Sequence, residues 1–247
     1  MVMTRKFGLI GEKLSHSFSK GYFDAKFLKL SLSNYVYSNY EFSDLSRVNN
    51  LLNDPEVVGL NVTNPYKTQI IPYLSELSNE AKEINAVNCI KIANGKSIGF
   101  NTDCYGFSQS IKPFLEPIHN KALIIGTGGS SKAVAYALQK IGVDVFYLSR
   151  TQQANPKVIT YDSLNANVIN ACKLIVNCTP IGLFPDLNES PQIPYEFITP
   201  EHLCYDLIYN PPETQFLLKC NAQGALIVNG LSMLHQQAEK AWEIWQE

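Results

Sequence analysis

A short apolar run, a glycine turn and an amphipathic pattern follow one another directly in the segment 121–141. Lys121 to Ile125 has the length and composition of a buried strand, and the turn Gly126-Thr127-Gly128-Gly129 comes next. Apolar residues from Ala133 to Ile141 then recur at helical spacing, with the helix expected to begin near Ser130. Glycines in such a turn let the backbone approach a pyrophosphate, and the first amides of the helix face that anion. The segment therefore predicts a Rossmann-like dinucleotide-binding domain.

The residues after the next expected strand bear on which dinucleotide is bound. An enzyme that uses NAD commonly carries Asp or Glu at this point to bind the ribose hydroxyls, whereas this chain has Ser149-Arg150-Thr151. A carboxylate would repel a 2′-phosphate and an arginine would bind it, so the segment favours NADP. The alternative is a solvated arginine at the end of a strand, which is the commoner setting for arginine.

Apolar runs of strand length alternate with helical patterns along the whole chain. We expect strands at 7–10, 57–62, 122–125, 143–148, 174–176, 203–207 and 225–228. Such alternation is typical of α/β folds with mostly parallel sheets. The expected fold is an N-terminal α/β substrate domain, a Rossmann-like NADP-binding domain, and a C-terminal helix at 232–245 that returns to the first domain. The expected boundaries are 1–103 with 231–247 for the first domain and 104–230 for the second.

Asn94-Gly95 is the strongest turn signal, because both residues tolerate positive φ and favour a type I′ turn between antiparallel strands. The two-residue loop fixes the register of the two strands. Counting outward puts Asn88 and Asp103 on one face at the open end of the hairpin, where both side chains could contact one small ligand. Asp103 could also cap a helix that starts at Cys104.

Composition and charge exclude several classes of function. The formal net charge is -2, and Lys and Arg are not interleaved with aromatic residues in any run, so we expect no nucleic-acid partner. The chain lacks a signal peptide and an apolar stretch of membrane-spanning length, so we expect a cytoplasmic protein without membrane contact. The six cysteines and four histidines lack the spacing of a metal site, and we expect neither metal nor disulfide. Monomer and homodimer both remain open.

Two polar segments precede the glycine turn, namely 61–67, which ends in Lys67, and 101–103, which ends in Asp103. A lysine and an aspartate beside a bound redox cofactor can polarise a carbonyl and handle its proton while a hydride moves. This pattern indicates an oxidoreductase. Taken singly, a lysine is most often solvated and an aspartate here is most naturally a helix cap. Which of the two is the base stays open.

With these motifs in place, the chain resembles the shikimate dehydrogenase family from Phe7 to about Gln237. The matching segments are Leu14-Ser15-His16-Ser17-Phe18-Ser19, 61–67, Ala86-Val87-Asn88, Asn101-Thr102-Asp103, the glycine turn, 177–182, 206–216 and 234–238. The resemblance implies reversible reduction of 3-dehydroshikimate to shikimate with NADPH, a step of chorismate and aromatic amino-acid biosynthesis.

The resemblance also implies roles for single residues. Lys67 and Asp103 would be the catalytic pair, with Lys67 at the reacting oxygen. The substrate would contact Ser17 and Ser19 through its carboxylate and Asn61, Thr63, Asn88 and Asp103 through its hydroxyls, with Tyr209 and Gln237 closing the site. The cofactor would contact Gly126, Thr127, Gly128, Gly129, Ser130, Ser149, Arg150, Thr151, Thr179 and Gly230, the last beside the nicotinamide. Without the resemblance, Ser17 and Ser19 could equally well cap a helix that starts near Lys20.

The chain departs from the family pattern at several positions, one of which bears on the cofactor, and two rival functions remain. A second basic residue often follows the family's arginine, and Lys157 is the candidate to replace it here. A quinate/shikimate dehydrogenase that uses NAD would need a similar pocket, but Arg150 without a neighbouring acid argues against it. A catalytically silent dinucleotide-binding regulator would keep the glycine turn and lose the acid-base pair, whereas Lys67 and Asp103 are both present.

Overall fold

The computed structural model describes residues 3–14 and 17–247, which group into two units. The first comprises Met1–Thr102 with Ala238–Glu247, and the second comprises Asp103–Gln237. This division differs from the expected boundaries at Asp103 and at 231–237. A Cβ built on Gly106 would lie 2.6 Å from the carbonyl oxygen of Met233 and 2.9 Å from Cβ of Gln237. The start of the last helix therefore packs closely on the helix that carries Gly106, inside the second unit.

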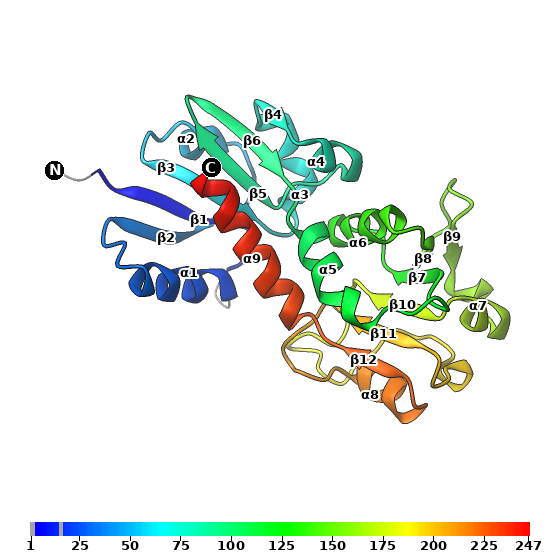
Figure 1. The fold of residues 1–247 in the computed structure, drawn as a ribbon. Helices are drawn as coiled ribbons and strands as arrows, with labels where there is room; N and C mark the ends of the chain where they lie inside the picture. The colour runs from blue at the N-terminus through cyan, green and yellow to red at the C-terminus, as the bar shows by residue number, and fades with distance from the viewer. Residues whose placement is uncertain (1–2, 15–16) are drawn as a thin grey trace. The chain divides into compact units, whose positions relative to one another are not determined.

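The first unit contains a mixed six-stranded sheet in the order β2-β1-β3-β5-β6-β4 (Figure 1). Its strands are β1 (Arg5–Gly11), β2 (Tyr35–Glu41), β3 (Val57–Val62), β4 (Glu76–Leu77), β5 (Cys89–Ala93) and β6 (Lys96–Phe100). β1 pairs in parallel with β2 and β3, and β5 runs antiparallel to β3 and β6. The helices are α1 (Phe18–Lys29), α2 (Val48–Leu52), α3 (Tyr66–Gln69), η1 (Ile71–Tyr73) and α4 (Asn79–Ile84).

The two faces of this sheet are covered by different helices, because alternate strand residues point to opposite faces. On β1, Phe7 and Leu9 join a cluster with α1 and the end of α9 (Leu231–Gln246), whereas Ile10 joins a cluster with α2, α3 and α4. Trp245 of α9 packs against Gly59 of β3, where any Cβ would lie 2.4 Å from the indole. The indole Nε1 donates to the carbonyl of Ile90 at 3.0 Å. A glycine inside the strand thus makes room for the C-terminal helix.

The second unit contains a six-stranded sheet in the order β12-β11-β10-β7-β8-β9, with every neighbouring pair parallel. Its strands are β7 (Lys121–Ile125), β8 (Asp144–Ser149), β9 (Val158–Thr160), β10 (Leu174–Asn177), β11 (Leu203–Asp206) and β12 (Leu226–Val228). The helices are α5 (Asp103–Ile111), η2 (Lys112–Phe114), α6 (Gly129–Lys140), η3 (Tyr161–Ser163), α7 (Ala166–Ala171), η4 (Tyr195–Phe197), α8 (Gln215–Ala222) and the start of α9. The strand order reverses between β7 and β10, which is where ligands bind in doubly wound sheets.

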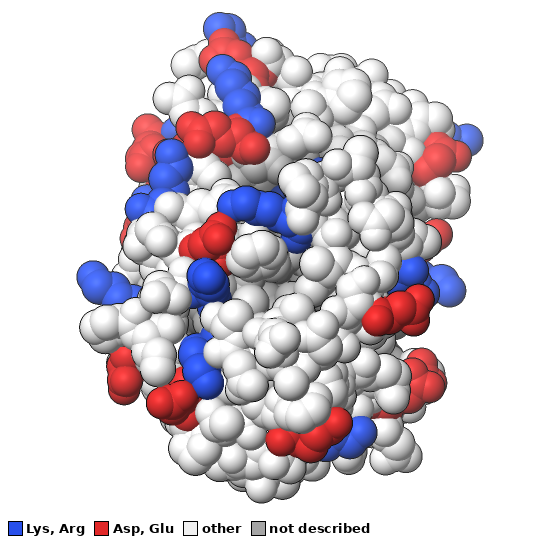
Figure 2. All heavy atoms as spheres, turned by 90° about the vertical axis from the view of Figure 1, so that its right-hand side faces the viewer, with Lys and Arg blue, Asp and Glu red and all other residues white. Residues whose placement is uncertain are grey.

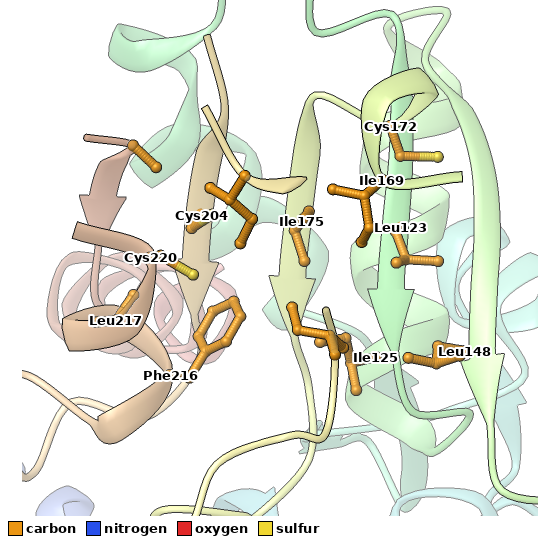
Figure 3. Close-up of a cluster of buried hydrophobic side chains, with 13 residues drawn as sticks. Leu123, Ile125, Leu148, Ile169, Cys172, Ile175, Cys204, Phe216, Leu217 and Cys220 are labelled. Atoms are coloured by element: carbon orange, nitrogen blue, oxygen red, sulfur yellow. The ribbon is translucent and has the colours of Figure 1, made fainter. Parts of the chain in front are cut away.

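One face of this sheet is buried by α7 and α8. Figure 3 shows the ring of Phe216 on α8 lying over the strands, with Ile169 of α7 and Cys172, which directly follows that helix, beside Leu123. Strands buried in this way contain almost continuous apolar sequence, as 121–125 does. The layered arrangement confirms the expected α/β class with a Rossmann-like second domain.

The hairpin prediction is confirmed at its turn and is wrong at its open end. Asn94 and Gly95 have φ values of 54° and 72°, as a type I′ turn requires. However, β6 ends at Phe100, and Asp103 is the first residue of α5. The strand pairing therefore does not extend to Asp103, and the aspartate begins the helix instead of preceding it.

The seven strands expected from apolar runs are present, but β2, β4 and β9 were not predicted. β2 alternates buried and exposed positions, with Tyr37 buried and Val36 exposed, because it lies at the edge of its sheet. β4 and β9 are only two and three residues long. Short or half-polar strands of this kind produce no continuous apolar run.

Side chains of opposite charge are interspersed on the face drawn in Figure 2. Within the part of the chain that the structure describes, Lys157 pairs with Asp144 at 2.6 Å and Lys173 pairs with Glu201 at 3.0 Å. Among the same residues, no helix is long and apolar enough to span a bilayer. Residues 3–14 and 17–247 also bring no three His, Cys, Asp or Glu side chains together in a metal-binding group. All six cysteines are free thiols.

Candidate active site and cofactor site

Most of the substrate residues expected in the first unit lie at one edge of its sheet. β1 and β3 are parallel, so their carboxyl ends meet there, and β5 starts at the same edge because it runs antiparallel to β3. Asn61 lies in β3 near its end, and Asn88 directly precedes β5. The amide of Val62 donates to the carbonyl of Asn88 at 2.8 Å. Residues that are distant in sequence are thus adjacent at this edge.

Lys67 lies in α3, the short helix that follows β3. Its neighbour Tyr66 is buried and donates its hydroxyl to the carbonyl of Phe42 at 2.6 Å. The carbonyl of Lys67 accepts from the amide of Val87 at 2.7 Å, which ties α3 to the segment before β5. The side chains of Lys67 and Thr63 are half-buried. The backbone of Lys67 is therefore held in place beside the segment that leads through Asn88 into β5.

Asn88 and Thr102 form a reciprocal pair at the same edge. The Nδ2 group of Asn88 donates to Thr102 Oγ1 at 3.0 Å, and the amide of Thr102 donates to Asn88 Oδ1 at 2.6 Å. Asn101 donates from Nδ2 to the carbonyl of Ala86 at 3.0 Å. All three polar side chains are at least nine-tenths buried. Buried polar groups persist only when they are hydrogen-bonded, so these bonds determine the path of the chain up to Thr102.

The serines of the N-terminal motif differ in their contacts. Ser17 occupies the N-cap position of α1 but makes no capping hydrogen bond, and its buried Oγ has no partner among the described residues. The structure therefore does not support a capping role for Ser17. Ser19 is half-buried, and its hydroxyl lies near enough to the phenol of Tyr37 to lower the pKa of that group. Ser15 and His16, which belong to the same motif, lie outside the described residues.

Asp103, Tyr209 and Gln237 belong to the second unit. Asp103 is buried at the start of α5, and Tyr209 is half-buried, which raises the pKa of its phenol. Gln237 lies on α9 and donates from Nε2 to the carbonyl of Leu234 at 3.0 Å. The predicted substrate roles of these three residues stay predictions.

The glycine turn after β7 has the geometry that a dinucleotide requires. Gly126 has φ of +104°, a conformation that other residues rarely adopt, and a Cβ built on Gly128 would meet open space. α6 begins at Gly129, so its first amides follow the turn. Ser131, in the first turn of α6, is fully buried and its Oγ has no partner among the described residues. The open backbone, the helix start and the unpaired hydroxyl fit a bound pyrophosphate.

The other expected cofactor residues surround this turn or follow β8. Thr179 lies close to Gly126, since a Cβ on the glycine would be 3.1 Å from its methyl group. Thr127, in the turn itself, and Ser130, the second residue of α6, are half-buried. At the end of β8, Ser149 Oγ accepts from the amide of Thr151 at 3.2 Å, while the side chain of Arg150 is exposed. Arg150 is thus accessible to a ligand at the end of this strand.

Known proteins match the chain along almost its whole length. Residues 9–90 match the model of the shikimate dehydrogenase substrate binding domain. A shikimate dehydrogenase (NADP(+)) of Aquifex aeolicus is 37% identical over 98% of this chain and 91% of its own length.

This chain belongs to the shikimate dehydrogenase family.

Solved structures of other proteins extend the similarity to the fold. The shikimate dehydrogenase of Thermus thermophilus, in complex with NADP(H) and shikimate, superposes with a TM-score of 0.87 at 31% identity, covering 98% of this chain and 93% of that one. A quinate dehydrogenase of Corynebacterium glutamicum, in complex with NAD, gives a TM-score of 0.86 at 26% identity, with coverage of 98% and 93%. The shikimate dehydrogenase fold thus also occurs in a protein named for quinate.

The structure gives a different place to Lys157, which was expected to add a second positive charge near Arg150. Its Nζ lies 2.6 Å from the carboxylate of Asp144, the first residue of β8, whereas Arg150 follows the last. The two charges are therefore directed to opposite ends of that strand. In this member of the shikimate dehydrogenase family, Arg150 lacks the support expected from Lys157.

Gly230 is required by the backbone around it. A Cβ at this position would lie 2.0 Å from the carbonyl oxygen of Leu207, and the amide of Gly230 donates to the carbonyl of Ile208 at 3.1 Å. Close backbone approach thus accounts for the glycine within the second unit. Its predicted place beside the nicotinamide stays a prediction.

A buried polar network at the ends of β10 and β11 was missed by the sequence reasoning. The carboxylate of Asp206 is fully buried and accepts from Asn177 Nδ2 at 3.1 Å, the amide of Ile208 at 3.0 Å and Thr214 Oγ1 at 2.6 Å. Burial raises its pKa to about 6, against the lowering effect of these bonds. Asn177 Oδ1 in turn accepts from the hydroxyl of Thr179 at 2.7 Å. The only sequence signal was a polar residue at the end of each apolar run.

Proposed function

We propose that this protein is an NADP-dependent shikimate dehydrogenase. It transfers a hydride reversibly between NADPH and the ketone carbon of 3-dehydroshikimate, giving shikimate. The observation that carries the proposal is the arrangement at one sheet edge of a family member, where Asn61, Thr63, Lys67 and Asn88 come from successive segments of the first unit. Hydrogen-bonding groups concentrated at the ends of strands are suited to a ligand with several hydroxyls.

Ser17 and Ser19 bind the carboxylate of the substrate in this proposal. The buried Oγ of Ser17, which has no partner among the described residues, supports the assignment, because a buried hydroxyl without a partner is unfavourable unless a ligand supplies one. Asn61, Thr63, Asn88 and Asp103 bind the hydroxyls. Tyr209 and Gln237 complete the set of substrate contacts.

Lys67 supplies the proton in the direction of reduction. Bound NADPH would supply the hydride for the ketone carbon, and the carbonyl oxygen, which would gain negative charge, would need a proton. An ammonium group at that oxygen stabilises the developing charge and then donates the proton. The hydrogen bond from the amide of Val87 to the carbonyl of Lys67 holds the backbone of Lys67 in place for this role. Asp103 is its catalytic partner and hydrogen-bonds a substrate hydroxyl.

NADP is the cofactor in this proposal, held by the second unit. The turn 126–130 and Thr179 take the pyrophosphate, Ser149, Arg150 and Thr151 take the adenosine ribose and its 2′-phosphate, and Gly230 lies at the nicotinamide. The exposed guanidinium of Arg150 at the end of β8 supports the choice of NADP over NAD, because it matches a phosphate dianion in charge and hydrogen bonding. The first unit supplies most of the substrate-binding residues, namely Ser17, Ser19, Asn61, Thr63, Lys67 and Asn88. We expect the protein to be cytoplasmic and either a monomer or a homodimer.

Initial rates with shikimate and quinate, each with NADP and with NAD, test the proposal. The expected result is the highest kcat/KM for shikimate with NADP. A higher kcat/KM for quinate with NAD would identify a quinate dehydrogenase instead. Binding of NADP without turnover of either substrate would indicate a catalytically silent regulator.

A further inference from the structure

Tyr37 is a buried tyrosine, the third residue of the edge strand β2, and no substrate or cofactor role was expected for it. Its side chain is fully buried, and its ring stacks on Phe23 of α1 with centroids 4.8 Å apart and planes 11° apart. Ring packing of this kind leaves the phenol little freedom to move. The hydroxyl is therefore held in one place by apolar contacts.

The phenol of Tyr37 contacts a residue that we assign to the substrate, since it donates to Asn61 Oδ1 at 2.8 Å. Burial raises the pKa of this phenol well above its ordinary value, against the lowering effect of the nearby Ser19 hydroxyl, and keeps it a neutral donor. A single buried hydroxyl thus connects β2 and β3.

The contacts of Asn61 determine which way its amide faces. Nδ2 donates to the carbonyl of Asn88 at 3.3 Å. A carbonyl can only accept, so rotating the amide by 180° would set two acceptor oxygens against each other. Oδ1 must therefore face Tyr37, and the phenol must donate. One N–H of Nδ2 is directed to Asn88, and no acceptor within residues 3–14 and 17–247 takes the other, so the second N–H is the donor that Asn61 has left for a ligand oxygen.

We propose that Tyr37 is a positioning residue for substrate binding, which fixes the Asn61 amide before the substrate arrives. The inference rests on the proposed function, since Asn61 matters to the ligand only if it contacts it. Groups that are already ordered lose less conformational entropy when they bind. Removing the phenolic hydroxyl leaves Oδ1 of a buried amide without its donor, so the amide is held by the Asn88 bond alone.

Tyr37→Phe removes this hydroxyl and keeps the ring. The expected result is a rise of about three- to tenfold in KM and Kd for shikimate, the range of one net hydrogen bond, with KM for NADP unchanged within about twofold. kcat should change less than KM, because the variant leaves Lys67 in place. Isothermal titration calorimetry with shikimate measures Kd independently of turnover.

Tyr205→Phe is the matched control in the second unit. Tyr205 is also fully buried, its hydroxyl is paired with Ser110 Oγ at 2.8 Å, and its ring packs against Phe107 with centroids 5.1 Å apart. The control loses a buried phenolic hydroxyl that bonds to Ser110 instead of Asn61. Equal changes in shikimate Kd in the two variants would overturn the proposal, as would a Tyr37→Phe protein that binds shikimate like the wild type.

A double-mutant cycle shows whether Tyr37 acts through Asn61. In an Asn61→Ala background, Tyr37→Phe should change the Kd for shikimate by less than about twofold, because the group that it positions is gone. Full additivity of the two substitutions would contradict a positioning role.

The failure of this inference can be told apart from failure of the proposed function. A wild-type protein that neither binds nor oxidises shikimate would contradict the proposed function. In that case NMR spectra of the Asn61 side-chain amide, recorded without ligand for the wild type and for Tyr37→Phe, still test whether Tyr37 fixes that amide. A large shift on mutation is expected, and unchanged resonances would refute the fixed amide.

Discussion

The backbone carbonyl of Lys67 accepts a 2.7 Å hydrogen bond from the amide of Val87. The bond joins the short helix α3 to the segment that leads into β5, and it does not involve the lysine side chain. The position of the backbone is therefore independent of the ammonium group that we assign to catalysis.

Because of this separation, Lys67→Ala should lower kcat by at least about 100-fold, the scale of a lost general acid, with little change in thermal stability. Initial rates with shikimate and NADP, together with a melting curve, measure both effects. Lys29→Ala, at the exposed end of α1, is the control and should retain full activity. A Lys67→Ala protein within a few-fold of wild type would remove this lysine from the mechanism.

Arg150→Ala should raise KM for NADP by about tenfold or more and leave KM for NAD nearly unchanged, since only NADP carries the phosphate that a guanidinium would bind. Lys157→Ala is the paired control. Its ammonium lies at Asp144, at the opposite end of β8, so neither KM should change. Equal effects of Arg150→Ala on both cofactors would refute the contact with the 2′-phosphate.

Asp206 should make the free energy of unfolding fall as the pH rises from about 4 to 6. Burial raises its pKa from 3.8 to about 6, so the folded protein holds the proton more tightly than the unfolded chain. The stabilisation is complete below pH 3.8. It is lost as the pH rises past the pKa of Asp206 in the folded protein, which lowers the free energy of unfolding by up to about 3 kcal/mol. Urea unfolding of wild type and Asp206→Asn across this range should show the difference between them changing with pH. A constant difference would refute the coupling.

His202 should have the opposite effect. Its ring is buried. Nδ1 accepts a hydrogen bond from the amide of Thr199 at 3.0 Å, and Nε2 lies 3.0 Å from the carbonyl oxygen of Ile169. Burial lowers its pKa below 6.5, so its contribution is present above that pH and is lost as the pH falls. His202→Gln should therefore destabilise the protein less at pH 5.5 than at pH 7.5, values about one unit either side of the ordinary histidine pKa. His119→Gln, whose ring is also buried with a lowered pKa, should show a change with pH in the same direction. A pH-independent effect of His202→Gln would contradict the coupling.

The elements that were predicted most accurately are those specified by adjacent residues. β7 has the predicted bounds and α6 starts within one residue of the expected position, because strand, glycine turn and helix are each determined by local sequence. The turn at Asn94-Gly95 was predicted correctly for the same reason. The residues found by resemblance likewise lie in contiguous motifs.

What could not be predicted depends on contacts between distant segments. The chain passes through α2 between Tyr37 and Asn61, and nothing near either residue in sequence indicates their hydrogen bond. The bonds of Asp206 to Asn177 and Thr214 likewise arise only when β10, β11 and the following loop are packed together. The hydrogen-bond partner of a buried polar side chain depends on which distant segments pack around it, whereas the sequence shows only the residue type.

The insertion of Trp245 over Gly59 has a consequence for the order in which the chain acquires its structure. The sheet that begins with β1 needs residues 238–247 to cover one of its faces, whereas the segment 103–237 is continuous. During synthesis, domains generally fold as their residues emerge from the ribosome. The part of the protein that is made first therefore keeps an open apolar surface until translation reaches the segment 238–247.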